Sequence, residues 1–478
     1  MSFNSDEYFH SSKFKKILKL YEDTLYTDSP ALLTPDEFVD IAEFYYNNGL
    51  MEKAENLLNT TMEIYPGAAP PLLFKARIEL LDNNNADKAM EYVEQIEDKT
   101  DLEFYYIKAE IMVVLGHPDK ADDYLEGCFD FIDDEDRDYF AIDVAAIFLD
   151  YALPDKGEKW LARVEDTDIE EYKEQYARIT FEKGNYDKTQ KLYNELIDKD
   201  PYSVQYWNAL ASAQFLSEDY EGSIRSSEYA LAINPDNPAA LINKANSLYY
   251  LGSYKEAIKY YIKYNKLNPD DINSVMLLGY CYITVANFAK AAEMLAKAAS
   301  VIEDNDPNLT EIYKEWAYAL FQCGNKKACF DVIDRAEARG ADPIIMLLAR
   351  GNMLYWNGED EKGNACFVEA VKKSNNSKEV LAQVAGTLYT CKEFASAYNI
   401  YHFLELSGYE LRDDYVNLTI CCFVLNKIDE FLSNLKKSAT VASEYTKEQM
   451  GHLFPKGMPV ENYYKYMLDK IEKGSSLK

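Results

Sequence analysis

The segment INPDNPAALINKANSLYYLGSYKEAIKYYIKYNKLNPDD, residues 233–271, begins and ends on nearly the same residues, and this repetition decides the fold. Asn-Pro-Asp occupies positions 234–236 and returns at 268–270, which is 34 residues later. One interval further back the sequence reads Lys-Asp-Pro at 199–201, so Pro201, Pro235 and Pro269 are evenly spaced. Because a period of about 34 residues is the unit length of a helix-turn-helix repeat, the sequence predicts tandem helical hairpins.

Aligning the chain in segments of this length produces two columns of small residues. Two helices that pack face to face need a small side chain where their backbones come closest. The first column contains Ala42, Ala76, Ala109, Ala145, Ala177, Ala211, Ala245, Gly279, Ala317, Gly351, Ala385 and Thr419. The second column, twelve residues further on, marks the contact from the second helix of each pair and contains Ala54, Ala121, Gly157, Ala257, Ala291, Gly363 and Ala397.

A turn lies between the two columns, and it often contains glycine. Glycine tolerates the positive φ that ends a helix, so each of these glycines is expected to close the first helix of its pair. They are Gly49, Gly116, Gly184, Gly252, Gly324 and Gly358.

The pattern resembles the tetratricopeptide repeat family, whose signature is Trp-x2-Leu-Gly-x2-Tyr, then Ala-x3-Phe, then Pro. The matches are Trp207 with Leu210, Ala211 and Pro235; Leu278 and Gly279 with Tyr282, Ala291 and Ala298; and Ala245 with Gly252, Tyr254, Ala257, Tyr261 and Pro269. The resemblance implies an all-α fold, a superhelical solenoid of about twelve tandem repeats. We expect them to start at 35, 69, 102, 138, 170, 204, 238, 272, 310, 344, 378 and 412.

These starts divide the chain into five predicted segments. Residues 1–34 form an N-terminal capping region, 35–169 about four divergent acidic repeats, 170–309 four regular repeats, 310–445 four further repeats, and 446–478 the C-terminal capping helices. A stacked array leaves an apolar face open at each end, so terminal helices are expected to cover it. The alternative for the last helix, PVENYYKYMLDKIEKG, is that it docks a partner.

The charge is concentrated in the N-terminal part. Of 82 acidic and 50 basic residues, positions 1–200 hold 47 and 21. Such a surface repels phosphate backbones and anionic headgroups, so we expect neither nucleic acid nor membrane as a partner. It favours a basic protein or peptide, and the alternative is that the acid only keeps a tyrosine-rich chain in solution.

Targeting features and cysteines point to a cytoplasmic protein. The start, MSFNSDEYFH, is acidic where a secretory signal is basic, and no apolar run approaches the length of about 18 residues that a membrane span needs. The eight cysteines at 128, 281, 323, 329, 366, 391, 421 and 422 form no CxxC pair, and most are expected in the core.

The sequence contains no recognisable catalytic, metal or cofactor motif. His10, His117, His402 and His452 are isolated, and neither a P-loop, a Gly-x-Gly-x-x-Gly nor a Gly-x-Ser-x-Gly occurs. The acidic run FIDDEDRD lacks the glycine and final glutamate of a calcium loop. We therefore predict no catalytic residues, no metal and no cofactor.

A surface remains as the candidate site. In the resembled family the first helix of each repeat lines the concave groove, and positions two, five, nine, twelve and thirteen of the repeat project inward. Amides alternate with aromatic rings there, a composition typical of protein-binding surfaces. The predicted partner-binding residues are Asn208, Phe215, Asn246, Tyr249, Tyr250, Tyr280, Tyr318, Phe321, Asn352, Tyr355, Trp356 and Tyr389. The alternative is that individual rings pack against neighbouring repeats.

The leading hypothesis is a non-enzymatic scaffold or adaptor that binds a partner protein or an extended peptide in this groove. A regulatory peptide sensor that changes superhelical shape is the alternative, and an enzyme would require a polar pocket with paired titratable groups. Chaperone-docking members of the family hold a C-terminal carboxylate with inward lysine and arginine. The matching region here offers Asn208, Asn243 and Asn246 but no inward cation, so we do not expect that ligand.

Overall fold

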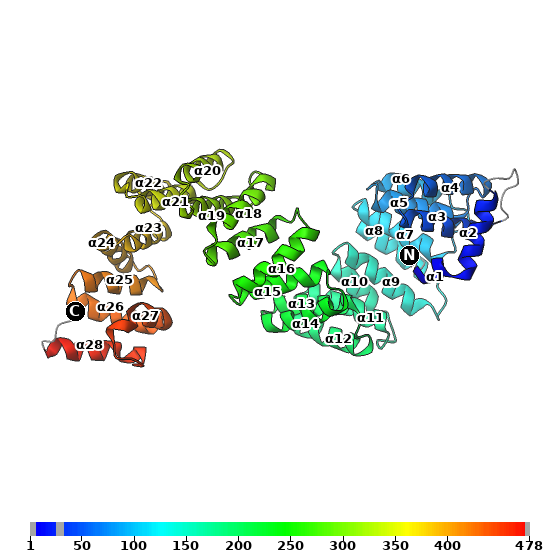
Figure 1. Ribbon diagram of the computed structural model, residues 1–478. Coiled ribbons are helices and arrows are strands. Elements are labelled where there is room, and N and C mark those ends of the chain that lie inside the picture. The colour runs from blue at the N-terminus through cyan, green and yellow to red at the C-terminus, as the bar shows by residue number, and fades with distance from the viewer. Residues whose placement is uncertain (1–5, 25–32, 474–478) are drawn as a thin grey trace. The chain divides into compact units, whose positions relative to one another are not determined.

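The computed structural model describes residues 6–24 and 33–473 and consists of helices, with no strand among these residues. The chain divides into two compact units, Met1–Ile233 (unit 1) and Asn234–Lys478 (unit 2). Each unit is an all-α solenoid in which helices follow one another as antiparallel neighbours in pairs, and each pair packs on the next (Figure 1).

Unit 1 begins with two end helices and continues with six helical pairs. Its helices are α1 (Asp6–His10), α2 (Ser12–Thr24), α3 (Pro35–Asn47), α4 (Met51–Ile64), α5 (Ala69–Leu81), α6 (Ala86–Glu94), α7 (Leu102–Val114), α8 (Pro118–Phe129), α9 (Arg137–Asp150), α10 (Pro154–Leu161), α11 (Glu170–Glu182), α12 (Tyr186–Lys199), α13 (Val204–Leu216) and α14 (Tyr220–Ile233).

Unit 2 contains six further pairs and a C-terminal group of short helices. The pairs run from α15 (Pro238–Tyr250), α16 (Tyr254–Leu267), α17 (Ile272–Thr284), α18 (Phe288–Val301), α19 (Leu309–Gln322), α20 (Lys326–Ala338), α21 (Pro343–Trp356), α22 (Asp360–Lys373), α23 (Lys378–Thr390) and α24 (Phe394–Leu406) to α25 (Asp414–Val424) and α26 (Ile428–Val441). The final group comprises α27 (Ser443–Met450), the 3-10 turns Gly451–Leu453 and Val460–Asn462, and α28 (Tyr463–Glu472).

The small-residue columns lie where the helices of each pair meet. Every member of both columns is buried. At Gly279 an added Cβ would come within 2.8 Å of Cγ of Leu295 on the paired helix. The predicted close approach of the helices is therefore confirmed, and the larger apolar side chains fill the space around each contact.

The six turn glycines all adopt a positive φ, between 72° and 80°. The prediction that they close the first helix of a pair is confirmed at every one. The same left-handed geometry occurs at the corresponding turn in five pairs without glycine, at Ala152, Glu218, Ala286, Lys392 and Asn426. The packing of the two helices imposes this backbone, because an L side chain adopts it at a cost.

Short helices pack on the end pair of each unit. Phe14 of α2 is fully buried in a cluster with Phe38 of α3, and Tyr463 of α28 stacks on Phe454 with ring centroids 3.6 Å apart. Parts of the predicted capping regions, residues 1–5, 25–32 and 474–478, lie outside the described residues. The division into five segments stays a prediction.

A buried polar cluster joins α8 to α10 in unit 1. Trp160 is fully buried, and its Nε1 donates to Oδ1 of Asp122 at 2.9 Å. The other carboxylate oxygen accepts from Lys156 at 3.1 Å and from Lys159 at 2.9 Å. A single carboxylate thus ties two helices together.

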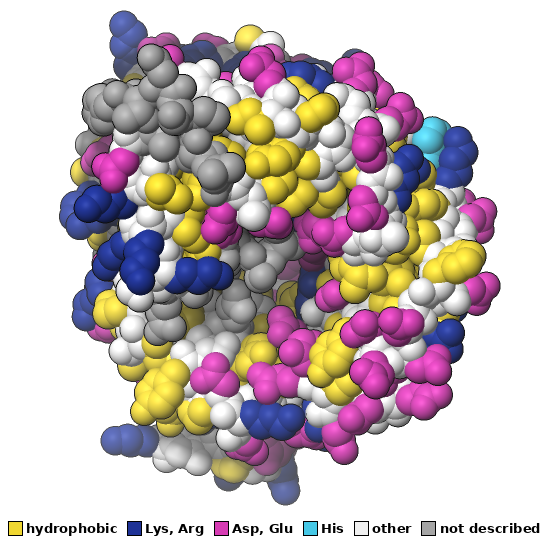
Figure 2. Space-filling model, turned by 90° about the vertical axis from the view of Figure 1, so that its right-hand side faces the viewer, with side chains coloured by type: hydrophobic (Ala, Val, Ile, Leu, Met, Phe, Trp, Pro, Cys, Tyr) yellow, Lys and Arg dark blue, Asp and Glu magenta, His cyan; other side chains and the backbone are white. Residues whose placement is uncertain are grey.

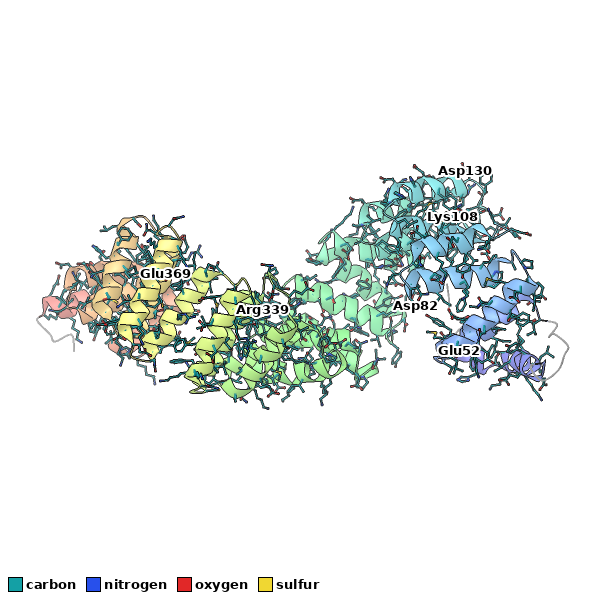
Figure 3. All side chains as sticks on the ribbon, turned by 90° about the horizontal axis from the view of Figure 1, so that it is seen from above. Glu52, Asp82, Lys108, Asp130, Arg339 and Glu369 are labelled. Atoms are coloured by element: carbon teal, nitrogen blue, oxygen red, sulfur yellow. The ribbon has the colours of Figure 1, made fainter. Side chains whose placement is uncertain are left out.

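Arg339, at the end of α20, holds the long turn between α18 and α19 (Figure 3). Its guanidinium donates to the carbonyls of Ala299 at 2.8 Å and Ile302 at 2.6 Å, and Nε donates to Asp304 at 2.6 Å. These carbonyls belong to the last turn of α18, which has no partner for them within the helix. The arginine therefore acts as a C-terminal cap supplied by the next pair.

Replacing Gly351 by alanine is expected to destabilise unit 2 by about 1–3 kcal/mol. The added Cβ would overlap the ring of Phe367, which is buried and stacked on Tyr355, so the ring has no room to move. Gly386→Ala is the matched control, because its Cβ would meet only the Tyr401 hydroxyl, at 3.7 Å. There alanine should stabilise the helix by about 0.5–1 kcal/mol. Urea unfolding of both variants measures the change in the free energy of unfolding, which should fall in G351A and rise in G386A. Equal changes in the two variants would contradict the prediction.

Candidate functional site

The first helices of successive pairs in unit 2 lie side by side from α17 to α23. Contacts join α17 to α19, α19 to α21 and α21 to α23 (Figure 1). We call the surface made by the inward positions of α15, α17, α19, α21 and α23 the first-helix face. Ten of the twelve predicted binding residues lie on these helices, and Asn208 and Phe215 lie on α13 of unit 1.

Position nine of the repeat supplies half-buried polar groups to the first-helix face. The Tyr261 hydroxyl donates to Oδ1 of Asn246 at 2.7 Å, and the Thr387 hydroxyl donates to Oδ1 of Asn352 at 2.7 Å. Tyr280 and Tyr318 occupy the same position on α17 and α19 and are also half-buried. Both asparagines retain their amide N–H groups for other acceptors.

Position thirteen supplies the exposed aromatic rings. The side chain of Tyr250 is 59% exposed and that of Trp356 is 42% exposed. Trp356 meets Tyr318 edge to face and Phe321 at a tilt, each with ring centroids 5.9 Å apart. Neither neighbour stacks on the indole, and the side chain remains partly accessible to a ligand.

Position twelve contributes mainly to packing within its own pair. Three of these rings meet the first residue of the following helix: Phe215 meets Tyr220, Tyr249 meets Tyr254, and Tyr389 meets Phe394, with centroids 5.6–5.9 Å apart. Tyr355 is buried, 8% exposed, and stacks on Phe367 of α22. The structure thus places Tyr355 in the core, where it can support the face but cannot touch a partner. Phe321, at the same position of α19, instead supports Trp356.

A pocket of about 750 Å³ opens on the first-helix face between α19, α21 and α23. We call it the Trp356 pocket. Its lining consists of Glu311, Lys314, Glu315, Tyr318, Ile345, Leu348, Ala349, Asn352, Met353, Trp356, Gln383, Gly386, Thr387 and Thr390. The structure thus brings together three residues that the sequence singled out, namely Tyr318, Asn352 and Trp356.

Charged residues of the pocket were missed when the binding residues were predicted. Lys314 Nζ lies 2.7 Å from Oε1 of Glu311 and 3.3 Å from Oε1 of Glu315, all on the first two turns of α19. Counting from the expected start at 310, Glu311 and Lys314 occupy positions two and five, which project inward by resemblance. The repeat register therefore contained the signal, but only rings and amides were chosen.

Several of the predicted binding residues do not line this pocket. Burial is the main cause that raises the pKa of Tyr249, which does not line the pocket. Burial also raises the pKa of Tyr389 to about 12, and this ring is likewise absent from the pocket lining. Asn208 and Phe215 belong to the other unit.

Acidic side chains dominate parts of unit 1. Seen from the side of the N-terminal helices, Figure 2 shows Asp and Glu gathered along the right of the surface, with Lys and Arg mainly at its left edge. Burial raises the pKa of Glu110 on α7, although Arg77 and the Tyr151 hydroxyl, which donates to it at 3.1 Å, lower it. Selection of a basic partner by this acid stays a prediction.

The described residues contain no group of three His, Cys, Asp or Glu side chains that could hold a metal ion. None of the helices in the described part of the chain combines the length and the apolar character required for a membrane span. All eight cysteines are free, and five of them are buried. The prediction that most lie in the core is confirmed.

Comparison with known proteins identifies the repeat. Models of the tetratricopeptide repeat match residues 177–238 and 214–279. The chain is 25% identical over 232 residues to the BBSome complex member BBS4 of Bos taurus, covering 48% of this chain and 43% of that protein. It is 28% identical over 136 residues to an Hsp70-Hsp90 organising protein of Plasmodium falciparum, covering 28% and 52%. The chain spans less than half the length of the first three curated relatives that it matches.

The chain also matches solved structures at low identity. A tetratricopeptide repeat protein from Parabacteroides merdae has a TM-score of 0.42 and 16% identity, over 53% of this chain and 98% of that one. The crystal structure of the APC/C hetero-tetramer Cut9-Hcn1 has a TM-score of 0.36 and 12% identity, over 93% and 98%.

Proposed function

Because the chain is a tetratricopeptide repeat protein, we propose that it is a non-enzymatic scaffold or adaptor that binds a partner protein or an extended peptide along the first-helix face of unit 2. One observation carries the proposal. The exposed rings of Tyr250 and Trp356 stand on the same set of first helices as the amides of Asn246 and Asn352, and Trp356 and Asn352 line the Trp356 pocket.

The chemistry of this face suits an extended peptide. Exposed Tyr and Trp provide a large apolar contact at a small entropic cost, and residues of this kind dominate the binding energy of protein interfaces. An amide offers both a donor and an acceptor, which matches the N–H and C=O of a peptide backbone. The proposal assigns the chain no reaction, and the pocket supplies anchoring rather than catalysis.

The names of two relatives support a protein partner. One is a member of a complex, and the other is an organising protein named for Hsp70 and Hsp90. The Trp356 pocket carries two carboxylates and one lysine, so a chaperone-type C-terminal carboxylate is disfavoured there. The partner is therefore expected to present a side chain other than an acid to this pocket.

Replacing Tyr250 and Trp356 by alanine together is expected to weaken partner binding about 30-fold or more, because each exposed ring is an anchor of the proposed interface. The two rings are exposed, so circular dichroism should show an unchanged helical content. Affinity capture from native cell extract with the wild-type and double-variant chains, followed by quantitative mass spectrometry, identifies the proteins that are lost.

The control is Phe403→Ala with Leu406→Ala. These side chains are 56% and 75% exposed on α24, the second helix of its pair, so the control removes comparable apolar surface elsewhere in unit 2. Proteins retained by the control and lost by Y250A/W356A would be partners of the first-helix face. Identical lists from the wild type and both double variants would refute the proposed location.

A further inference from the structure

The charges in the Trp356 pocket do not balance. Lys314 is shared between Glu311, at 2.7 Å, and Glu315, at 3.3 Å, so one ammonium serves two carboxylates. No other Lys, Arg or His lines the pocket. The pocket therefore carries one uncompensated negative charge where a ligand can reach it.

Glu315 shows the consequence of this imbalance. Its side chain is only 23% exposed, and burial raises the pKa of the carboxyl even though Lys314 lowers it. Burial also lowers the pKa of Lys314, but the hydrogen bond and charge of Glu311, together with Glu315, raise it on balance. Lys314 thus hydrogen-bonds both carboxylates, but its single positive charge neutralises only one of them.

The hydroxyl of Tyr280 adds an independent observation. It is buried and has no hydrogen-bond partner among the described residues. Its pKa is raised by burial and then by the charges of Glu311 and Glu315, so it lies close to both carboxylates. The hydroxyl lies beneath the pocket lining rather than on it, so it offers the two carboxylates no hydrogen bond and leaves them free for a ligand donor.

The pocket also offers an exposed aromatic side chain. Trp356 lines it and is 42% exposed, although Tyr318 and Phe321 contact the indole. The amides of Asn352 and Gln383 and the hydroxyl of Thr390 also line the pocket and can accept hydrogen bonds.

We propose that the Trp356 pocket binds an arginine side chain of the partner, with the guanidinium stacked on Trp356 and donating to Glu315 and Glu311. This inference rests on the proposed function and names the residue that the first-helix face recognises. Arginine fits better than lysine, because its planar group combines five donors in a fixed fork with a face that stacks on aromatic rings.

The test follows the indole N–H signal of Trp356 by NMR, assigned by its loss in Trp356→Phe. The probes are the peptides Ac-Ala-Arg-Ala-NH2 and its citrulline analogue, which has nearly the same shape and no charge. The arginine peptide should shift the signal saturably and bind about tenfold or more tightly than the citrulline peptide. Glu315→Gln should weaken the arginine peptide by about tenfold, whereas Lys314→Gln, which removes the competing ammonium, should tighten it.

Glu369→Gln is the matched control, because this carboxylate lies on α22, 53% exposed and outside the pocket lining (Figure 3). It should leave the affinity unchanged. Equal affinities for the two peptides, no shift of the Trp356 signal, or no effect of Glu315→Gln would each overturn the proposal. If partners are still lost with Y250A/W356A in that case, the scaffold function stands and only the arginine is wrong; if neither experiment responds, both fail.

Discussion

Asp122→Ala is expected to lower the free energy of opening of α8–α10 by about 3 kcal/mol. The substitution leaves the indole N–H of fully buried Trp160 without an acceptor and removes two charge-assisted bonds, from Lys156 and Lys159. Both lysines keep other carboxylates, Lys156 that of Asp119 at 2.7 Å, so the stranded indole accounts for much of the loss. Asp122→Asn, which retains an acceptor for the indole, should cost about half as much.

Hydrogen exchange measures this effect locally. Amides of α8–α10 should exchange on the order of 100-fold faster in D122A. The exchange rates of amides in α21–α24 of unit 2 should not change, because each repeat is stabilised mainly by its immediate neighbours. Asp119→Ala is the control, since that side chain is 91% exposed. An equal response to both substitutions would contradict the role given to Asp122.

The same carboxylate predicts a pH dependence. Burial raises the pKa of Asp122, but hydrogen bonds from Lys159, Trp160 and Lys156 lower it below its ordinary value of 3.8 on balance. A depressed pKa means that the stabilisation is present above 3.8 and is lost as the pH falls through the lower, folded-state value. The difference between D122A and the wild type should therefore shrink in acid and persist at neutral pH.

Arg339→Ala should destabilise the junction of α18, α19 and α20 by about 2–3 kcal/mol. It removes the donors of the carbonyls of Ala299 and Ile302 and the partner of Asp304 at once. Arg339→Lys keeps the charge but offers a single point donor, so it should recover less than half of the loss. Exchange of amides in the last turn of α18 reports the effect directly.

The control for this prediction is Arg335→Ala, on the same helix. Arg335 lies over the Trp316 ring, 5.2 Å from its centroid, and caps no helix. Its replacement is expected to cost about 1 kcal/mol or less. If Arg335→Ala and Arg339→Ala cost the same, the guanidinium contributes only through general charge and packing, and the capping role is wrong.

The spacing of residues was enough to predict the fold, because each repeat carries the small residues and the turn that form its own pair of helices. The small residues at 34-residue intervals mark helix contacts, and one added methyl at Gly279 or Gly351 would overlap a neighbour. The turn glycines were equally informative. Ala152, Glu218 and Lys392 gave no such signal, since there the paired helices impose a left-handed backbone on residues that do not favour it.

The candidate site could be predicted only in part. The helical register placed the residues on the first helices. It did not distinguish Tyr355 at repeat position twelve, whose ring is buried, from Trp356 at position thirteen, whose ring is exposed. That difference depends on where Phe367 of the paired helix lies, which local sequence does not reveal. The charges of Glu311 and Lys314 follow from the repeat register, but the pocket that they line depends on how α19, α21 and α23 pack in three dimensions.

Contacts in each unit join a helix to those one or two places along the chain, and this has a mechanical consequence. Under a force applied to its ends, such a unit would unfold pair by pair rather than all at once. Each unfolded pair of about 34 residues would have an extended length of roughly 110–120 Å. The helices joined by Asp122 and by Arg339 would be expected to unfold at higher force than the others. Each unit is therefore expected to lengthen in steps under force, one helical pair at a time.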